Sequence, residues 1–219
     1  MKWALILALA ASPLLPPMNR MASARGGQTL AALAQAVSPA ALPAAAGPLA
    51  ARRQAAEGAA AKLQHLRRNG QQLRPDPSPT VLTESEINAY LASSEVALPK
   101  GVRTLRVAGQ TGMMTARARV NFDEVTAGAR SPNPLLALFS GVHDVEAVAH
   151  ASGSGGVARV HVDSIALDGV PVPRVALELF ANYYLRPRHP NLGLDSSFRM
   201  PERIQTAALG PHNLTVTQR

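Results

Sequence analysis

A regular alternation of apolar and polar side chains in residues 113–122 constrains the fold of this chain more than any other feature. Apolar residues there alternate with Thr115, Arg117, Arg119 and Asn121. A period of two is typical of a β-strand, because successive side chains point to opposite faces of a sheet. One face of this strand is therefore apolar and the other basic, which predicts an antiparallel sheet covered on one side only.

Three further segments have the composition of strands and complete two predicted hairpins. Residues 102–108 precede the first strand and are joined to it by the glycine-containing turn 109–112. Residues 142–151 and 157–167 are rich in valine and alanine and flank a second glycine-rich turn. Because short turns of this kind join antiparallel neighbours, we expect four paired strands, with a last hairpin over 202–218.

The pairing of the second hairpin decides whether a metal site is available. Pairing that is symmetric about the glycines would place Glu146 opposite Asp163 and His150 opposite Arg159, with His161 nearby. Imidazoles and carboxylates of this kind bind zinc or another divalent metal. Their spacing matches no closed-site motif, and charged rows are ordinary on the wet face of a sheet. We therefore predict no metal and no cofactor.

Two short helices have clear start signals. In LTESEINAYL, residues 82–91, Thr83 and Glu86 have the spacing of a capping box, so each side chain binds the backbone N–H of the other residue. In NPLLALFSG, residues 133–141, Asn133 is a cap that precedes a proline at the first helical position. This second helix is almost entirely apolar. It is therefore either buried or an apolar rim at a ligand entrance or a membrane.

The segment RVALELFANYYL, residues 174–185, predicts a helix that is apolar around most of its circumference. Its only polar side chains, Arg174, Glu178 and Asn182, recur every four residues and form one narrow line. Such a helix needs cover on nearly every side. One flat sheet face cannot supply that cover, so the sheet curls around the helix, a partner protein joins, or an apolar ligand fills the space.

The N-terminus has the features of a secretory signal peptide over residues 1–24. Lys2 precedes an apolar run that is too short to span a bilayer as a helix. Small residues favour cleavage after Ala24, and cleavage nearer Ala10 is the alternative. The mature chain is therefore expected to be secreted to the periplasm or cell envelope, where it is soluble or peripherally attached.

Residues 25–79 predict an Ala/Pro-rich linker that contains a basic helix around 50–73. The prolines and alanines before this helix favour no regular structure. The helix itself has a weak apolar face made mainly of alanine, so it either lies on a membrane or is solvated and lightly packed. We expect a single α+β domain over residues 80–219.

The formal charge of +8 suits an anionic membrane surface or a nucleic acid. Aromatic residues make up only 4% of the chain, and no nucleic-acid recognition motif is present, so we expect no nucleic acid as a partner. The chain also lacks cysteine, a Gly-x-Ser-x-Gly elbow and a glycine-rich phosphate loop before a helix. These absences predict a protein that is not an enzyme.

Residues 80–219 resemble the bacterial tubular lipid-binding (TULIP) domains, which are related in fold to bactericidal/permeability-increasing protein. The resemblance rests on the element order and on LTESEINAYL, LPKGV and DGVPVP. It implies a strongly twisted antiparallel sheet wrapped around a long apolar helix, with a short capped helix before the sheet and lipid held between them. Many small bacterial members are lipoproteins, whereas this chain has no cysteine to carry an anchor.

The expected function is non-enzymatic binding of a lipid or other apolar small molecule in the bacterial cell envelope. Small residues at inward strand positions, such as Ala116 and Ala158, favour a cavity. A dry core, or an apolar patch covered by an unknown partner protein, is the alternative, and the chain would then be an envelope scaffold or interaction module. The predicted ligand-binding residues are Leu136, Phe139, Val175, Leu179, Phe180, Tyr183, Arg186 and Arg188.

Overall fold

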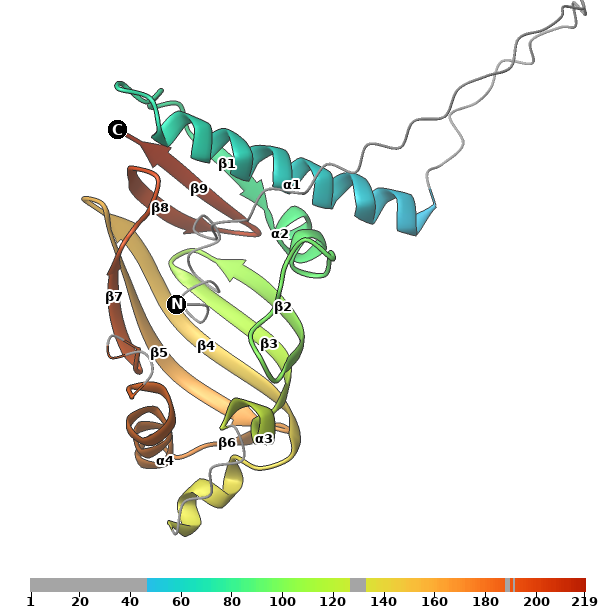
Figure 1. The fold of residues 1–219 in the computed structure, drawn as a ribbon, viewed down its shortest axis with the longest axis vertical. Helices are drawn as coiled ribbons and strands as arrows, with labels where there is room; N and C mark the ends of the chain where they lie inside the picture. Colours follow the sequence, from blue (N-terminus) through green and yellow to red (C-terminus); the bar gives the residue numbers. More distant parts are fainter. Residues whose placement is uncertain (1–46, 127–132, 188–189, 191) are drawn as a thin grey trace, which may run out of the picture.

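The computed structural model describes residues 47–126, 133–187, 190 and 192–219. The fold is α+β, with one open antiparallel sheet of nine strands and few helices (Figure 1). The strand order is β1-β9-β8-β4-β3-β2, and β5 pairs with β4, β6 and β7. The strands are β1 Thr80–Thr83, β2 Val102–Gln110, β3 Met113–Asn121, β4 Val142–Ser154, β5 Val157–Leu167, β6 Val170–Pro171, β7 Asp195–Arg199, β8 Ile204–Gly210 and β9 Asn213–Gln218.

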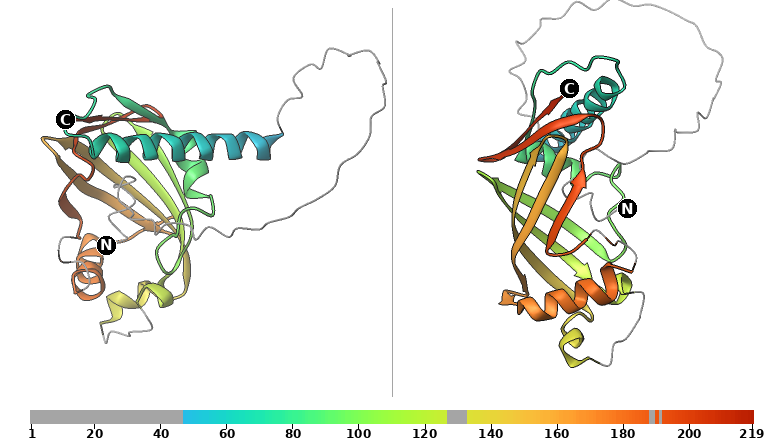
Figure 2. Two further views of the ribbon diagram at one scale, coloured as in Figure 1. Left: turned by 45° about the horizontal axis from the view of Figure 1, so that its top comes forward. Right: turned by 90° about the vertical axis from the view of Figure 1, so that its left-hand side faces the viewer.

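The helices lie at the two ends of the curved sheet (Figures 1 and 2). The predicted segment RVALELFANYYL forms an α-helix that continues as one π-helical turn. The predicted NPLLALFSG helix is a 3-10 helix with the Asn133 side chain as its cap. The helices are α1 Pro48–Gly70, α2 Glu84–Leu91, α3 Phe122–Val125, the 3-10 helix η2 Pro134–Leu138, α4 Arg174–Phe180 and the π-helix η3 Ala181–Leu185.

The four central strands pair as two hairpins, as the alternating pattern predicts. Met114 and Val120 of β3 are buried, whereas Arg117 and Arg119 on the opposite face are exposed. Arg117 forms an ion pair with Glu146 on the neighbouring β4, at a distance of 2.5 Å between Nε and Oε2. Cross-strand pairs of this kind stabilise a solvated sheet face modestly.

The register of the second hairpin differs from the predicted symmetric pairing. Gly155 and Gly156 both have positive φ, at 60° and 76°, and form a two-residue turn. His150 therefore pairs with His161, and Arg159 pairs with Ser152. The prediction placed the centre of the turn one residue too early, because the sequence does not show which glycines occupy the left-handed conformation.

The α2 helix starts as predicted, and its side chains also cover the edge of the sheet. The Thr83 hydroxyl accepts a hydrogen bond from the Glu86 N–H, and the Glu86 carboxylate accepts one from the Thr83 N–H, so the capping box is confirmed. Asn88 donates to the Val107 carbonyl and accepts from the Val107 N–H, each at 2.8 Å. The Asn88 amide thus occupies the place of a neighbouring strand beside β2.

The longest helix is α1, which is basic and amphipathic, and not the predicted apolar helix. The apolar segment forms seven residues of α4 and five of η3, at the opposite end of the sheet from α1 (Figure 1). A sheet wrapped around one long apolar helix is therefore not what this structure contains. Phe180 of α4 is covered by Phe122 of α3 and by Phe139, the residue that follows η2.

The α1 helix packs into the same hydrophobic core as the strands, although the expected domain boundary at residue 80 excludes it. Leu63 and Leu66 are both 2% exposed and belong to the main core cluster. Asn69 is also buried and donates a hydrogen bond of 2.8 Å to Gln218 on β9. The Gln218 amide in turn donates to the Leu66 carbonyl. We call this pair the Asn69–Gln218 clasp.

The core role of α1 predicts that a fragment of residues 80–219 is much less stable than a fragment of residues 47–219. Removing α1 uncovers the core and removes the Asn69 and Leu66 partners of the Gln218 amide. Each lost leucine is worth about 2–5 kcal/mol. Thermal unfolding followed by circular dichroism measures this difference. A fragment of residues 55–219 loses only exposed turns of α1 and should unfold like 47–219. Equal melting temperatures for 80–219 and 55–219 would contradict the prediction.

Candidate functional site

An apolar cavity of about 100 Å³ lies where α1 and the β8–β9 hairpin meet the ends of the long strands. Its walls come from segments that are far apart in the sequence. The lining residues are Leu63, Leu66, Leu82, Glu84, Ile87, Val107, Ala108, Gly109, Met114, Ala151, Ser152, Ala158, Arg159, Phe198, Met200, Pro201, Ile204, Ala207, Leu209, Asn213, Leu214 and Val216.

Small residues leave this space open at the crossing of β4 and β8. The two strands pair only at Gly153 and Ala207, and a Cβ atom added to Gly153 would lie 2.9 Å from the Ala207 Cβ and from the Met200 sulfur. Glycine is therefore required for this close approach. Ala151, Ala158 and Ala207 line the cavity with single methyl groups, so the facing side chains do not fill it.

Glu84 is an acidic group in a largely apolar wall. Its carboxylate contacts the His212 ring at 2.8 Å and accepts a hydrogen bond of 3.1 Å from the Gly109 N–H. Burial acts to raise the pKa of Glu84, but these hydrogen bonds outweigh it and lower the pKa below its ordinary value. Glu84 is therefore charged at neutral pH and fixes the start of α2 against the β8–β9 turn.

A second, more open hollow of about 550 Å³ lies on the solvated face of β4, β5 and β7, opposite the face that lines the apolar cavity. Ala151, Ser152 and Arg159 line both spaces, so the apolar cavity and the polar hollow share a wall. The remaining lining residues of the hollow are mostly polar, and they are Gly112, His150, Val160, His161, Asp195, Ser196 and Ser197.

Of the predicted ligand-binding residues that the structure describes, none lines the apolar cavity. Leu136, Phe139 and Phe180 are buried at the other end of the sheet, where the Phe139 and Phe180 ring centroids are 4.3 Å apart. Phe122 packs edge-on against both rings. We call Phe122, Phe139, Phe180, Tyr183 and Tyr184 the aromatic cluster. The buried residues of the aromatic cluster form a packed core. Their role in ligand binding stays a prediction.

The other predicted ligand residues lie near the surface of that same end. Leu179 is partly buried, whereas Val175 and Tyr183 are 55% and 49% exposed. Arg186 is exposed, and Arg188 lies outside the described residues. The structure thus brings Phe139 and Phe180 together at a place away from the cavity.

Most residues that line the apolar cavity were not predicted to belong to a binding site. Leu63 comes from α1, which was assigned to the linker, and Phe198 comes from β7, which was not predicted as a strand. Ala158 is the exception, since its inward position on an alternating strand was predicted to favour a cavity. Long-range packing of α1, β7 and β9 has no local signal in the sequence.

His143 and His212 each pair with one acidic residue, whereas His150 and His161 share Asp163. His143 contacts Asp168 at 2.6 Å, and His150 contacts Asp163 at 2.8 Å. The hydrogen bond with Asp168 raises the pKa of His143, and the same contact lowers the pKa of Asp168. Among the residues that the structure describes, no group of three or more histidine, aspartate or glutamate side chains could hold a metal ion.

Comparisons of this chain with protein-family models, curated proteins and solved structures found no match. Within residues 47–126, 133–187, 190 and 192–219, no helix is both long enough and apolar enough to cross a membrane. The fold and the site therefore have to be interpreted from their own geometry.

The packing of the aromatic cluster predicts that Phe180→Ala lowers the free energy of unfolding by about 3–5 kcal/mol, because a buried ring is lost. Urea denaturation measures the change. Tyr183→Ala, at a half-exposed position three residues after Phe180, should lower it by less than about 1 kcal/mol. A Phe180→Ala protein as stable as the wild type would show that this ring is not part of the core.

Glu84→Gln should be less stable than the wild type at pH 7 by about 1 kcal/mol, because a charged acceptor is lost. A lowered pKa stabilises the fold above the ordinary pKa of 4.5, and this contribution is lost as the pH falls through the lower folded value. The difference between the two proteins should therefore shrink below pH 4.5. Urea titrations at several pH values test this. Glu95→Gln, at an exposed position, is the control and should not change the free energy of unfolding. If the difference between Glu84→Gln and the wild type does not change with pH, the lowered pKa of Glu84 is contradicted.

Proposed function

We propose that this chain is a non-enzymatic protein of the bacterial cell envelope that binds a lipid or another apolar molecule. The observation that carries the proposal is the apolar cavity beneath α1 and the β8–β9 hairpin. Its wall is formed mainly by leucine, valine, methionine and alanine side chains, which favour an acyl chain over a polar ligand. The resemblance of residues 80–219 to TULIP domains supports the same class of ligand.

The size of the cavity limits what enters it without a conformational change. An engineered apolar cavity of about 150 Å³ holds one benzene molecule, and this cavity measures about 100 Å³. The enclosed space therefore fits one end of an acyl chain. A longer portion requires α1 or the β8–β9 hairpin to move outward. Met114 and Met200 in the wall have flexible side chains that adapt to such a change.

An anionic membrane surface is the proposed source of the ligand. The α1 helix exposes Arg52 and Arg53 near its start and Arg68 near its end. Anionic lipid head groups attract such side chains over short distances. The cavity wall includes Leu63 and Leu66 of the same helix, so contact with the membrane and access to the cavity involve one element.

The test compares two variants in which an alanine of β8 is replaced by leucine. Ala207 lines the cavity, whereas the next residue, Ala208, is exposed on the other face of β8. Ala207→Leu fills the cavity and should weaken binding of a fatty acid at least about tenfold, which corresponds to about 1.4 kcal/mol. Ala208→Leu should leave the affinity unchanged. Titration calorimetry with dodecanoate measures both affinities, and thermal unfolding verifies that both variants are folded.

Native mass spectrometry of the full chain, purified without detergent, provides a second readout. A stoichiometric lipid adduct in the wild type that is absent in Ala207→Leu supports the proposal. A stable protein with no adduct and no uptake of dodecanoate or phospholipid would overturn it. That result would favour the alternative function, an envelope scaffold with a dry core.

A further inference from the structure

The solvated face of β5 and β7 carries two arginines that lie close to each other. Arg159 of β5 pairs with Ser197 of β7, and Arg199 follows Ser197 by two residues on the same strand. Residues two apart on a strand point to the same face. Phe198, between them, points to the other face and lines the apolar cavity. The exposed side chains of Arg159 and Arg199 therefore lie diagonally across two neighbouring strands, on the face opposite the cavity.

Two serine side chains flank Arg159 in the same row. Ser152 of β4 pairs with Arg159 on one side, and Ser197 pairs with it on the other. Residues directly opposite in antiparallel strands have their Cβ atoms about 4.5–5.5 Å apart and share one face. All three residues line the open hollow of about 550 Å³. The hollow thus holds a guanidinium group between two hydroxyl groups, with Arg199 at the next position on this face.

The charges of the two arginines are not matched by acidic side chains in the described part of the chain. On the β3 and β4 part of the same face, Arg117 and Arg119 form ion pairs with Glu146 and Asp144. Arg159 and Arg199 form no ion pair with any residue that the structure places. Like charges on neighbouring strands repel each other, so this part of the sheet attracts an anion.

The acidic residues of this part of the face already have other partners. Asp195, which lines the hollow, forms a hydrogen bond with the His161 ring, and its second oxygen lies 3.5 Å from Arg174. Asp163 contacts the His150 ring at 2.8 Å. Because both carboxylates are occupied by other groups, the guanidinium donors of Arg159 and Arg199 remain available to a ligand.

We infer that the hollow is a second binding site, separate from the apolar cavity, and that it binds a phosphate monoester group. Arg159 and Arg199 supply two positive charges, which match the charge of a phosphate dianion. Their guanidinium groups and the hydroxyl groups of Ser152 and Ser197 offer donors from several directions, as the three terminal oxygens of such a phosphate require. A carboxylate has one charge and two oxygens and leaves part of this site unused. The inference goes beyond the proposed function and does not depend on it.

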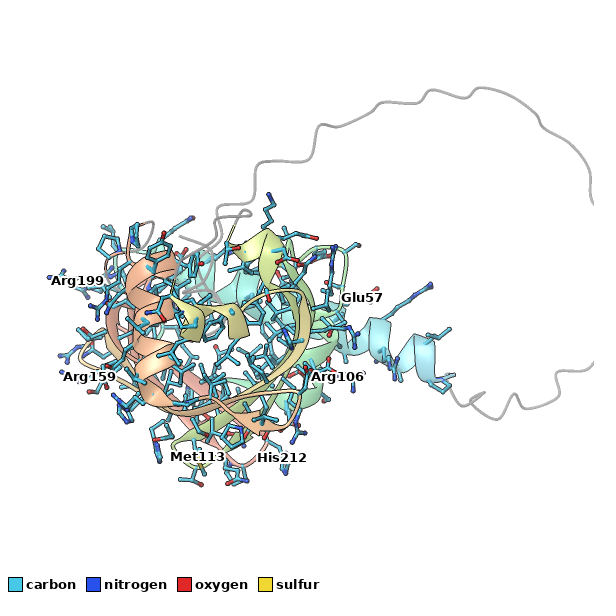
Figure 3. The ribbon with its side chains drawn as sticks, turned by 90° about the horizontal axis from the view of Figure 1, so that it is seen from below. Glu57, Arg106, Met113, Arg159, Arg199 and His212 are labelled. Carbon is cyan, nitrogen blue, oxygen red and sulfur yellow. The ribbon has the colours of Figure 1, made fainter. Side chains whose placement is uncertain are left out.

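The same sheet face offers a matched control. Arg106 is exposed on β2 and does not line the hollow. Its cross-strand neighbour is Arg117, whose charge is matched by Glu146. Figure 3 shows Arg159 and Arg199 on one side of the molecule and Arg106 on the opposite side. Arg106→Gln therefore removes the same charge as Arg159→Gln without changing the proposed site.

The first measurement is titration calorimetry of the full chain with inorganic phosphate at pH 8, where phosphate is mainly a dianion. Arg159→Gln and Arg199→Gln should each weaken phosphate binding at least about tenfold. Arg106→Gln should bind phosphate like the wild type. Ala207→Leu, which fills the apolar cavity on the other face, should also leave phosphate binding unchanged, so this site and the cavity are tested separately.

Thermal unfolding without phosphate distinguishes a binding role from a structural one. Arg159→Gln removes a like-charge repulsion and should melt at the same temperature as the wild type or higher. Phosphate should raise the melting temperature of the wild type more than that of Arg159→Gln. A lower melting temperature for Arg159→Gln without phosphate would overturn the assignment, because the arginine would then act through the fold.

A vesicle experiment identifies the source of the phosphate group. The full chain is sedimented with phosphatidylcholine vesicles that contain either phosphatidic acid, a phosphate monoester, or phosphatidylglycerol, a diester. A preference for phosphatidic acid that Arg159→Gln abolishes and Arg106→Gln retains would support a lipid head group. Binding of inorganic phosphate without this preference would support a soluble phosphate monoester.

Two results would overturn the inference while leaving the proposed function in place. One is a wild-type protein that neither binds inorganic phosphate nor prefers phosphatidic acid. The other is an equal loss of binding in Arg106→Gln and Arg159→Gln, because such a loss would reflect net charge and not a site.

Discussion

The close contact between Gly153 and Ala207 is the constraint on which the site depends. It is the only position at which β4 and β8 pair, and a side chain at residue 153 would not fit there. Because β4 and β8 pair at this one position, the β1-β9-β8 part of the sheet turns away from the β2–β5 part (Figure 2). The space beneath this turn is the apolar cavity, and alanine side chains keep it open.

The two ends of the curved sheet are covered by different kinds of side chain. At one end the aromatic cluster fills the space with interlocking rings. At the other end leucine side chains of α1 close the sheet, and the Asn69–Gln218 clasp satisfies the buried amides beneath them. Aromatic side chains leave little space, whereas aliphatic and methyl groups leave a cavity. The distribution of a few aromatic residues thus decides at which end of the sheet an apolar cavity remains.

Much of the local structure was predictable from the sequence, and most of the site was not. The alternation in β3 predicts the central strands, and Thr83 with Glu86 predicts the start of α2, because these signals lie within a few residues of one another. The register of the β4–β5 hairpin depends on which glycines adopt positive φ, and the pattern does not show this. The cavity requires α1, β7 and β9 to meet, and such contacts between distant segments have no local signature. The apolar character of α4 was evident, but its cover by η2 and α3 was not.

The Asn69–Gln218 clasp joins positions that are 149 residues apart. The β9 strand that carries Gln218 also supplies the partner of β1, in a register that pairs Thr80 with Val216. The α1 helix and β1 therefore have no complete partner until residue 218 has been synthesised. Contacts of such long sequence separation slow folding, because a large loop must close before they contribute. The cavity is consequently among the last features to form, because its walls come together only after β9 has been synthesised.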